Sequence, residues 1–279
     1  MAERADFLVE LGTEELPPKA LPALSAAFRD GLVARLAEAR LEHGEVEAFA
    51  TPRRLALKVR RLQLSQADQD LVLRGPPASV ARTEGGWSRA AEKFAASAGV
   101  PVDALIERAE GKGVYVFAHK KEAGARASDL LPRLVEGSLA ALPVPRRMRW
   151  GAAEAEFVRP VHWLVMLLGE RVVPCTLLGV EAGRESRGHR FMAPAPVALA
   201  HPGEYPERLE REGFVLASFE ARRERVRAQA ETAASEQGGR LVLDPALLDE
   251  VTALVEWPVP VAGEFEARFL DLPEEVLIA

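Results

Sequence analysis

The chain has 279 residues, a mass of 30.3 kDa and a formal net charge of −6, with 48% hydrophobic and 28% charged residues. These proportions are ordinary for a globular protein and exclude collagen-like, disulfide-scaffold and intrinsically disordered classes. The single cysteine, Cys175, cannot form an internal disulfide. No apolar run approaches the roughly 20 residues of a membrane-spanning helix, and the first residues do not resemble a signal peptide. We therefore expect a cytoplasmic protein without a membrane partner.

The first 65 residues predict a strand, a long helix and two further strands. Residues 6–12 alternate as a short strand and end in an acidic turn. Apolar residues at intervals of three and four predict a helix over 21–39, and the tandem prolines at 17 and 18 suit its first turn. Residues 45–64 predict two strands around a break at Thr51. In the second strand, Ala56, Lys58 and Arg60 alternate with apolar residues. This pattern predicts one buried face and one solvent-exposed, basic face.

The middle of the chain predicts a smaller group of elements. The patterns indicate helices over 87–98 and 102–108 and a strand over 114–120. A further helix runs to Leu142 with Ser128 as its expected N-cap. Residues 1–65 and 143–279 are thus expected to form the main body, and 66–142 a smaller α+β insertion or second lobe.

The remaining residues predict a hairpin and then mainly helices. Gly169 and Glu170 separate two apolar runs as a hairpin turn does. Helical periodicity and capping residues, among them Ser218, predict three helices, with short strands on either side of the last. The predicted elements are strands at 161–168, 171–180, 241–243 and 259–261, and helices at 202–211, 219–237 and 245–255. The fold class expected is α+β, with mixed or antiparallel sheets packed against helices.

The sequence ends abruptly at residues 274–279, inside what reads as the first turn and a half of an apolar helix opened by Pro273. We infer from this that the sequence is the N-terminal piece of a longer protein.

A search for catalytic chemistry finds none that the residue pattern supports. The five histidines form no metal-binding spacing, and no glycine-rich nucleotide loop or nucleophile elbow is present. Glu14 and Glu15 could act as an acid and base pair, although adjacent carboxylates before a helix more often favour its positive N-terminus. Cys175 is expected to be a buried, inert thiol within a strand. We predict no catalytic residue, no metal and no cofactor in this chain.

Four short segments concentrate arginine beside aromatic, histidine or proline residues, at 51–54, 146–151, 159–163 and 187–192. Guanidinium groups beside such surfaces bind phosphates and stack on unpaired bases. Because the net charge of the chain is negative, such binding is confined to local basic patches. The alternative is that these arginines pair with the acidic excess and cover the core with their stems. The candidate RNA-binding residues are Arg53, Arg54, Arg146, Arg147, Arg149, Arg187, His189 and Arg190.

Eight phrases in order along the chain resemble one family, the β subunit of bacterial heterotetrameric glycyl-tRNA synthetase. The most specific is Leu8-Val-Glu-Leu-Gly-Thr-Glu-Glu-Leu-Pro-Pro18. The other seven are Thr51-Pro-Arg-Arg-Leu55, Gly75-Pro-Pro77, Lys112-Gly-Val-Tyr115, Met148-Arg-Trp-Gly151, Phe157-Val-Arg-Pro-Val-His-Trp163, Gly188-His-Arg-Phe191 and Val255-Glu-Trp-Pro258.

The resemblance implies a cytoplasmic enzyme of two α and two β subunits that attaches glycine to its tRNA. The α subunit holds the active site and uses ATP with magnesium, whereas the β subunit binds and positions glycine tRNA. A β subunit of the family is more than twice this length, with histidine-aspartate and anticodon-binding domains downstream that are absent here. The resemblance also implies a fold similar to the editing-type domain of the phenylalanyl-tRNA synthetase β subunit.

Three roles follow as hypotheses for this region. The first is a non-catalytic part that positions tRNA and assembles the complex. The second is a docking module for the α subunit or for the rest of the β subunit, which an apolar patch bordered by arginine would favour. The third is a hydrolase of mischarged tRNA, which a deep pocket holding Glu14 or His189 with a shifted pKa would favour.

Overall fold

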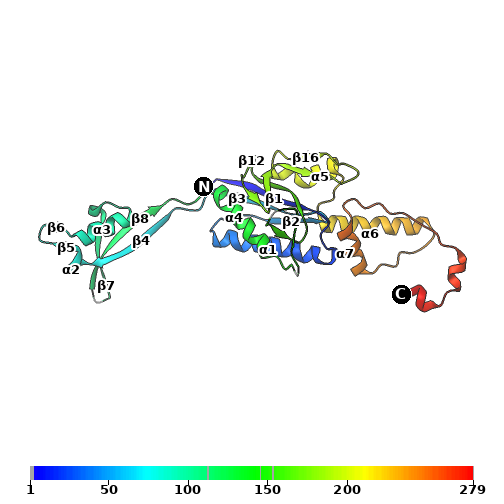
Figure 1. Cartoon of the computed structure of the whole chain (residues 1–279), viewed down its shortest axis with the longest axis horizontal. Helices are drawn as coiled ribbons and strands as arrows, with labels where there is room; N and C mark the ends of the chain where they lie inside the picture. Colours follow the sequence, from blue (N-terminus) through cyan, green and yellow to red (C-terminus); the bar gives the residue numbers. More distant parts are fainter. Residues whose placement is uncertain (1–2, 112, 145, 153, 279) are drawn as a thin grey trace. The chain divides into compact units, whose positions relative to one another are not determined.

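The computed structural model describes residues 3–111, 113–144, 146–152 and 154–278 and has an α+β fold (Figure 1). The chain divides into two compact units. The small unit comprises Met1–Arg4, Leu36–Glu42 and Gln63–Leu131, and the large unit comprises Ala5–Arg35, His43–Leu62 and Pro132–Ala279. The smaller insertion or second lobe expected at 66–142 stays a prediction.

The large unit is built on a seven-stranded mixed sheet with the order β13-β14-β11-β1-β3-β2, in which β12 also pairs with β11. The β11–β12 hairpin is confirmed, and Gly169 at its turn has a φ of +58°, which glycine adopts without strain. The second strand ends much earlier than predicted because the chain turns away to form two short strands. The strands are β1 Arg4–Thr13, β2 Val46–Thr51, β3 Arg54–Gln63, β11 Val161–Leu168, β12 Arg171–Val172, β13 Thr176–Leu177 and β14 Val180–Gly183.

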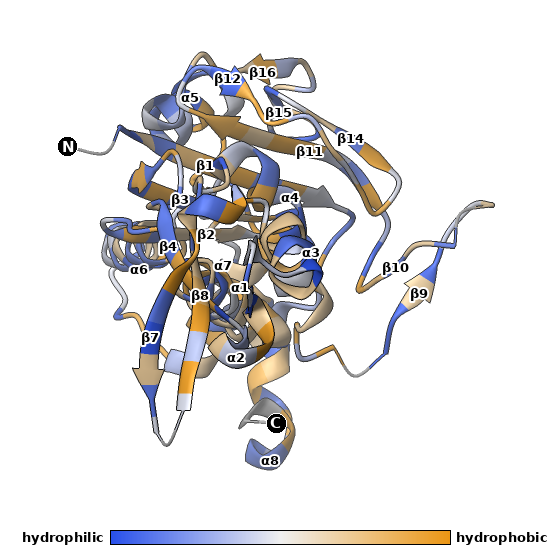
Figure 2. Cartoon of the chain, turned by 90° about the vertical axis from the view of Figure 1, so that its left-hand side faces the viewer, coloured by the Kyte–Doolittle hydropathy of each residue, from blue (hydrophilic) through white to orange (hydrophobic). Residues whose placement is uncertain are grey.

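Two helices lie alongside this sheet, α1 (Leu21–Glu38) and α4 (Ala127–Ala140) (Figures 1 and 2). The predicted apolar stripe of α1 is confirmed, since its leucines and phenylalanine are fully buried. The helices touch at small residues, where a Cβ added to Gly31 would lie 3.6 Å from the Cβ of Ser138. The N-cap prediction for Ser128 is wrong, because α4 already begins at the preceding residue. In the described part of the chain, no helix combines the length and apolar character needed to cross a membrane.

The opposite face of the sheet is covered by β15 (Glu185–Arg187), β16 (Pro196–Ala198) and α5 (Tyr205–Gly213) (Figure 2). The prediction of a solvent-exposed, basic face on β3 is therefore wrong for two of its three residues. Ala56 belongs to a buried core cluster, and Lys58 is only 4% exposed and forms an ion pair with Glu47 at 3.1 Å. Segments more than 120 residues away in sequence exclude water from this face.

Two further helices complete the regular part of the large unit. Helix α6 (Phe219–Glu236) is capped by Ser218, whose hydroxyl accepts a hydrogen bond from the amide of Ala221 at 3.2 Å, as predicted. Helix α7 (Pro245–Leu254) also matches its prediction. The strands predicted at 241–243 and 259–261 are wrong, because these apolar triplets lie exposed without a neighbouring strand. The chain then forms a 3₁₀ turn at Ala267–Asp271 and the short helix α8 at Glu274–Ile278.

The small unit is a three-stranded antiparallel sheet with the order β4-β8-β7 and helices packed on it. The helix predicted at 102–108 is wrong, since only Val102–Ala104 form a 3₁₀ turn before strand β7 begins. Strand β4 is not predicted from the sequence, because the glycine and prolines of Gly75-Pro-Pro77 are typical of a break between elements. The elements are β4 Gln69–Pro77, α2 Ala78–Ala81, β5 Arg82–Thr83, β6 Gly86–Trp87, α3 Arg89–Ala98, β7 Ile106–Glu110 and β8 Gly113–Glu122.

A buried arginine joins α6 to three other segments of the large unit. The Arg222 guanidinium donates to the carbonyl of Ala50 at the end of β2 (2.7 Å), to that of Thr252 in α7 (3.0 Å) and to that of Leu216 (2.5 Å). Burial lowers the pKa of Arg222 to about 10, so the side chain stays charged at neutral pH. The hydrogen bonds that hold this charge all go to backbone carbonyls and are charge-assisted, and the nearby carboxylates of Glu256 and Glu220 also favour the charged form.

We predict that Arg222→Met destabilises the chain by about 3 kcal/mol, because several buried carbonyls lose a charged donor at once. The measurement is urea unfolding monitored by circular dichroism at pH 7. Arg223→Met is the matched control, since Arg223 also joins α6 to α7, through Asp249, but is partly exposed. That pair should contribute at most about 1 kcal/mol. Equal losses in the two variants would contradict the prediction.

Candidate functional site

A network of buried polar side chains lies in the large unit between the sheet and the segments that cover it. At its centre, the Oε1 atom of Glu10 on β1 accepts the indole N–H of Trp163 at 2.6 Å and the hydroxyl of Ser186 at 2.7 Å. The Arg54 guanidinium lies 3.3 Å from the same oxygen. A buried carboxylate needs such donors, because water no longer solvates it.

The second carboxylate of this network comes from the segment that follows α7. Glu256 accepts the Thr51 hydroxyl at 2.7 Å and pairs with Arg54 at 3.1 Å. Burial alone would raise the pKa of Glu256, but the charge of Arg54 and the hydrogen bond from Thr51 together lower it. Burial likewise opposes the charge on Arg54, yet the two carboxylates raise its pKa. Arg54 therefore remains a cation held between two acidic side chains.

The placement of Arg54 corrects the sequence-based assignment of this residue to RNA binding. Its side chain is 0% exposed, and its remaining bonds go to the Thr51 hydroxyl, to Ser186 and to the carbonyl of Arg187. The sequence analysis did not single out Glu10 or Glu256 as its partners. A signal for the first was present, because an acidic residue interrupts the apolar strand Phe7-Leu-Val-Glu-Leu11 on the face that carries Leu8.

A group of charged side chains lies nearer the surface around the same tryptophan. Glu14 bonds His162 at 2.9 Å and Arg190 at 2.6 Å, and Arg190 also reaches Glu15 at 3.1 Å. Partial burial raises the pKa of Glu14, but the bonds and charges of Arg190 and His162 outweigh this effect and lower it. Glu14 is thus an ion-paired carboxylate at neutral pH.

Three guanidinium groups surround the Trp163 ring. The central carbons of Arg53, Arg54 and Arg187 each lie 5.6 Å from its centroid, within the range of cation–π attraction. Arg187 is exposed and Arg53 is half-buried. Burial and the nearby charge of Arg190 lower the pKa of Arg53. Three of the four predicted basic segments, 51–54, 159–163 and 187–192, therefore converge at one place.

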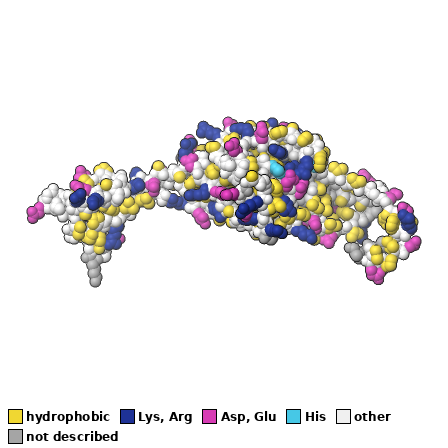
Figure 3. Space-filling view, viewed as in Figure 1, with side chains coloured by type: hydrophobic (Ala, Val, Ile, Leu, Met, Phe, Trp, Pro, Cys, Tyr) yellow, Lys and Arg dark blue, Asp and Glu magenta, His cyan; other side chains and the backbone are white. Residues whose placement is uncertain are grey.

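The fourth basic segment lies in a separate hairpin of the large unit, made of β9 (Met148–Arg149) and β10 (Glu156–Phe157). Arg149 pairs across this hairpin with Glu156 at 2.7 Å, and Arg147 bonds the Ala140 carbonyl at 2.5 Å. Arg146 is exposed. Basic and acidic side chains are interspersed over the visible face of the large unit (Figure 3).

His189 is held by backbone contacts beside exposed apolar residues. Its Nδ1 atom accepts the amides of Phe191 and Met192, both at 3.3 Å, and its own amide bonds the Gly213 carbonyl at 2.7 Å. Phe191 is 82% exposed. The loop therefore presents an apolar tip next to Arg190.

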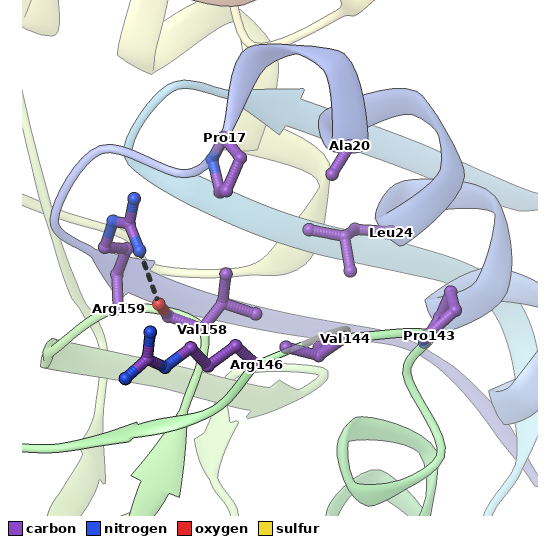
Figure 4. Close-up of a pocket in the computed structure, with 8 residues that line it drawn as sticks. All are labelled: Pro17, Ala20, Leu24, Pro143, Val144, Arg146, Val158 and Arg159. Carbon is purple, nitrogen blue, oxygen red and sulfur yellow. Dashed lines mark hydrogen bonds between the residues drawn. The ribbon is translucent and has the colours of Figure 1, made fainter.

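An apolar pocket of about 190 Å³ lies between the start of α1 and the segments on either side of the β9–β10 hairpin (Figure 4). Two arginines, Arg146 and Arg159, stand together at one side of it. Arg159 is fixed by the carbonyls of Val158 at 3.0 Å and Glu15 at 3.1 Å. The lining residues are Pro17, Ala20, Leu24, Pro143, Val144, Arg146, Val158 and Arg159.

The residues proposed for proton transfer lie away from this pocket. Neither Glu14 nor His189 lines this pocket, and the lowered pKa of Glu14 makes it a poor proton donor. Cys175 lies between β12 and β13 rather than within a strand, and burial raises the pKa of its thiol. Among the described residues, no three His, Cys, Asp or Glu side chains are placed to hold a metal ion.

Comparison with known proteins shows the family of the chain. Residues 7–279 match the family model described as the glycyl-tRNA synthetase beta subunit. The chain is 50% identical over 273 residues to a protein of Chromohalobacter salexigens named glycine–tRNA ligase beta subunit, and 48% over 275 residues to the protein of that name from Hahella chejuensis. The same name belongs to a Marinobacter nauticus protein that is 50% identical over 276 residues.

The chain therefore belongs to the glycyl-tRNA synthetase beta subunit family. Each of these alignments covers 98% of the chain and 40% of the relative. The chain thus spans about 40% of the length of the curated relatives it matches.

We predict that Glu256→Gln lowers the free energy of unfolding by about 3 kcal/mol at pH 7, because Arg54 loses a buried carboxylate partner. The pKa of Glu256 lies below its ordinary value of 4.5 in the folded chain. Its contribution is therefore complete above the unfolded pKa and is lost as the pH falls through the folded pKa. Urea unfolding from pH 7 to pH 3 should show the difference between the two proteins shrinking below about pH 4.5. A difference that stays constant would refute this assignment.

We also predict that Gly12→Ala disrupts the network at Trp163. A Cβ at Gly12 would lie 1.9 Å from ring atoms of Trp163, which is nearly fully buried. Overpacking of this kind costs about 1–3 kcal/mol in urea unfolding. Gly263→Ala is the control, because a Cβ there meets nothing within 4 Å. An unchanged unfolding midpoint for Gly12→Ala would show that the indole can leave its site freely.

Proposed function

We propose that the chain is the part of a glycine–tRNA ligase beta subunit that positions tRNA for charging with glycine. The observation that carries the proposal is the convergence around Trp163 of arginines from two segments, 51–54 and 187–192, that are more than 100 residues apart in the sequence. Guanidinium groups bind phosphate oxygens through paired N–H donors, and the tryptophan ring holds them in place.

The chemistry of the reaction is assigned to other parts of the assembly in this proposal. The α subunit activates glycine with ATP and magnesium, and this chain supplies no catalytic group. Its partners are glycine tRNA, the α subunit and a second β subunit. Arg53, Arg187, His189 and Arg190 form the proposed contact face, and Arg146, Arg147 and Arg149 form a second one on the β9–β10 hairpin. Arg54 supports the first face from within the core.

The net charge of −6 limits this binding to local contacts. Arg190 is already paired with Glu14 and Glu15, so a phosphate must compete with those carboxylates for it. Arg187 has no such competitor among the described residues. We therefore expect Arg187 to supply the stronger contact and the whole face to bind with marked salt sensitivity.

We predict that the purified chain binds labelled glycine tRNA and that affinity falls steeply with salt. Replacing Arg187 and Arg190 by Gln should reduce the slope of log affinity against log salt by about two. The control replaces Arg211 and Arg268 by Gln, which removes the same charge from exposed side chains elsewhere in the large unit. A non-cognate tRNA in the same series shows whether the face reads sequence. Absence of binding at low salt would eliminate the proposal.

A second candidate function, docking of another subunit, is favoured by the apolar pocket with Arg146 and Arg159 at one side. Apolar surface bordered by arginine is typical of protein interfaces. Ala20→Glu places a carboxylate at the half-buried edge of the pocket. If this variant binds tRNA normally but no longer associates with the α subunit, the pocket is the docking site.

A further inference from the structure

The sheet of the small unit has one face covered by helices and one face that is open. Leu73 on β4 and Val116 and Ala118 on β8 belong to the core formed with α2 and α3. Gly75 lies on this covered face, because a Cβ there would be 2.6 Å from the ring of Phe94 on α3. Side chains alternate between faces along a strand, so the intervening residues lie on the other face.

The strand register identifies the residues of the open face. Arg74 is opposite Phe117 across β4 and β8, and Ile106 is opposite Phe117 across β7 and β8. Tyr115 is opposite Arg108 in the same way. Residues directly opposite in an antiparallel pair share a face. The open face is therefore formed by Asp70, Val72, Arg74, Ile106, Arg108, Glu110, Tyr115, Phe117, His119 and Lys121.

Two arginines of this face lie over aromatic rings. The guanidinium carbon of Arg74 is 3.7 Å from the centroid of Tyr115, and that of Arg108 is 4.1 Å from the centroid of Phe117. Phe117 is only 2% exposed, while both arginines are exposed. Each guanidinium group therefore lies over an aromatic ring and is itself exposed to solvent.

The solvent-facing guanidinium planes are available for a ligand. Arg74 pairs with Glu110 at 3.1 Å, but both side chains are about half exposed, and such a pair contributes little. Arg108 has no carboxylate within 4.0 Å in the part of the chain that the structure describes. Val72 and Ile106 add exposed apolar surface, at 45% and 44%. Figure 3 shows hydrophobic and basic side chains next to one another on the small unit.

We propose that the open face of this sheet binds single-stranded RNA by stacking unpaired bases on Arg74 and Arg108. A base is a flat π-surface that stacks on a guanidinium plane as well as on an aromatic ring. The underlying rings prevent each guanidinium from rotating away, so little side-chain entropy is lost on binding. Lys121 and the two arginines outnumber Asp70 and Glu110, which suits a phosphate backbone. Every base has such a face, so recognition depends on single-strandedness more than on sequence.

The test uses the whole chain and fluorescein-labelled RNA oligonucleotides of roughly ten nucleotides, a length within the usual site sizes for single strands. Fluorescence anisotropy should show binding of single-stranded oligouridine and oligoadenosine, and much weaker binding of a duplex of the same length. Replacing both Arg74 and Arg108 by Lys keeps the positive charge but removes the planar guanidinium groups. We expect this variant to lose affinity by at least about fivefold, as the loss of base stacking predicts.

The matched control replaces Arg89 and Lys93 on α3 by Ala, which removes two exposed cations from the helical side of the same unit. This variant should retain the affinity of the unaltered chain within about twofold at moderate salt. Circular dichroism of each variant checks folding. Equal binding by the lysine variant would show that only charge matters and would overturn the stacking proposal.

Two further results would also overturn the proposal. One is failure of the unaltered chain to bind any single strand at low salt. The other is loss of a protein partner, rather than of RNA, in the lysine variant, which would make the face a protein interface. The outcome can be distinguished from that of the proposed function, because loss of affinity in the Arg74 and Arg108 variant reports on the small unit, whereas loss in the Arg187 and Arg190 variant reports on the large unit.

Discussion

The large unit depends on one buried cation held between two buried carboxylates. Arg54 connects β3 to Glu10 on β1 and to Glu256 after α7, and it also bonds β15 through Ser186. Burial of each charge alone would cost several kcal/mol, so the arrangement is tolerable only when every partner is present. The buried charges therefore disfavour misfolded arrangements, because a strand paired in the wrong register would leave one of these charges without a partner.

The same network fixes the surface above it. Glu10 accepts a hydrogen bond from the indole N–H of Trp163. The absence of a side chain at Gly12 lets the ring pack against β1. Together these two contacts fix the position of the indole. The exposed cations around the ring then lie at fixed places on a rigid base. Preorganised cations lose little conformational entropy when they meet an anionic partner. The core charges are thus structural, and the surface charges above them are the ones available to a ligand.

Local patterns in the sequence predict many of the helices and strands, but they do not predict which side chains of those elements are buried. Helix α1 was predicted from its apolar spacing and α6 from the capping residue Ser218, both of which act within a few residues. The exposure of Lys58 and of Arg54 was predicted wrongly, because it is set by segments beyond residue 185 and by Glu256. Strand β4 was missed because Gly75-Pro-Pro77 resembles a break, although the strand accommodates it through an irregularity between Arg74 and Pro77. For the candidate site, the sequence supplied the arginines, but which of them face solvent depends on remote acidic partners.

The separation between the partners of Arg54 also bears on how the protein is made. Arg54 and Glu256 are 202 positions apart, so a ribosome synthesises the arginine long before its second carboxylate. At roughly 5–20 residues per second, this interval is on the order of 10–40 seconds. During that time the charged side chains of β1 and β3 cannot all be buried, because one of their partners has not yet been synthesised. Until residue 256 has left the exit tunnel, Arg54 lacks its second carboxylate, which favours a nascent large unit that stays open to water on this face.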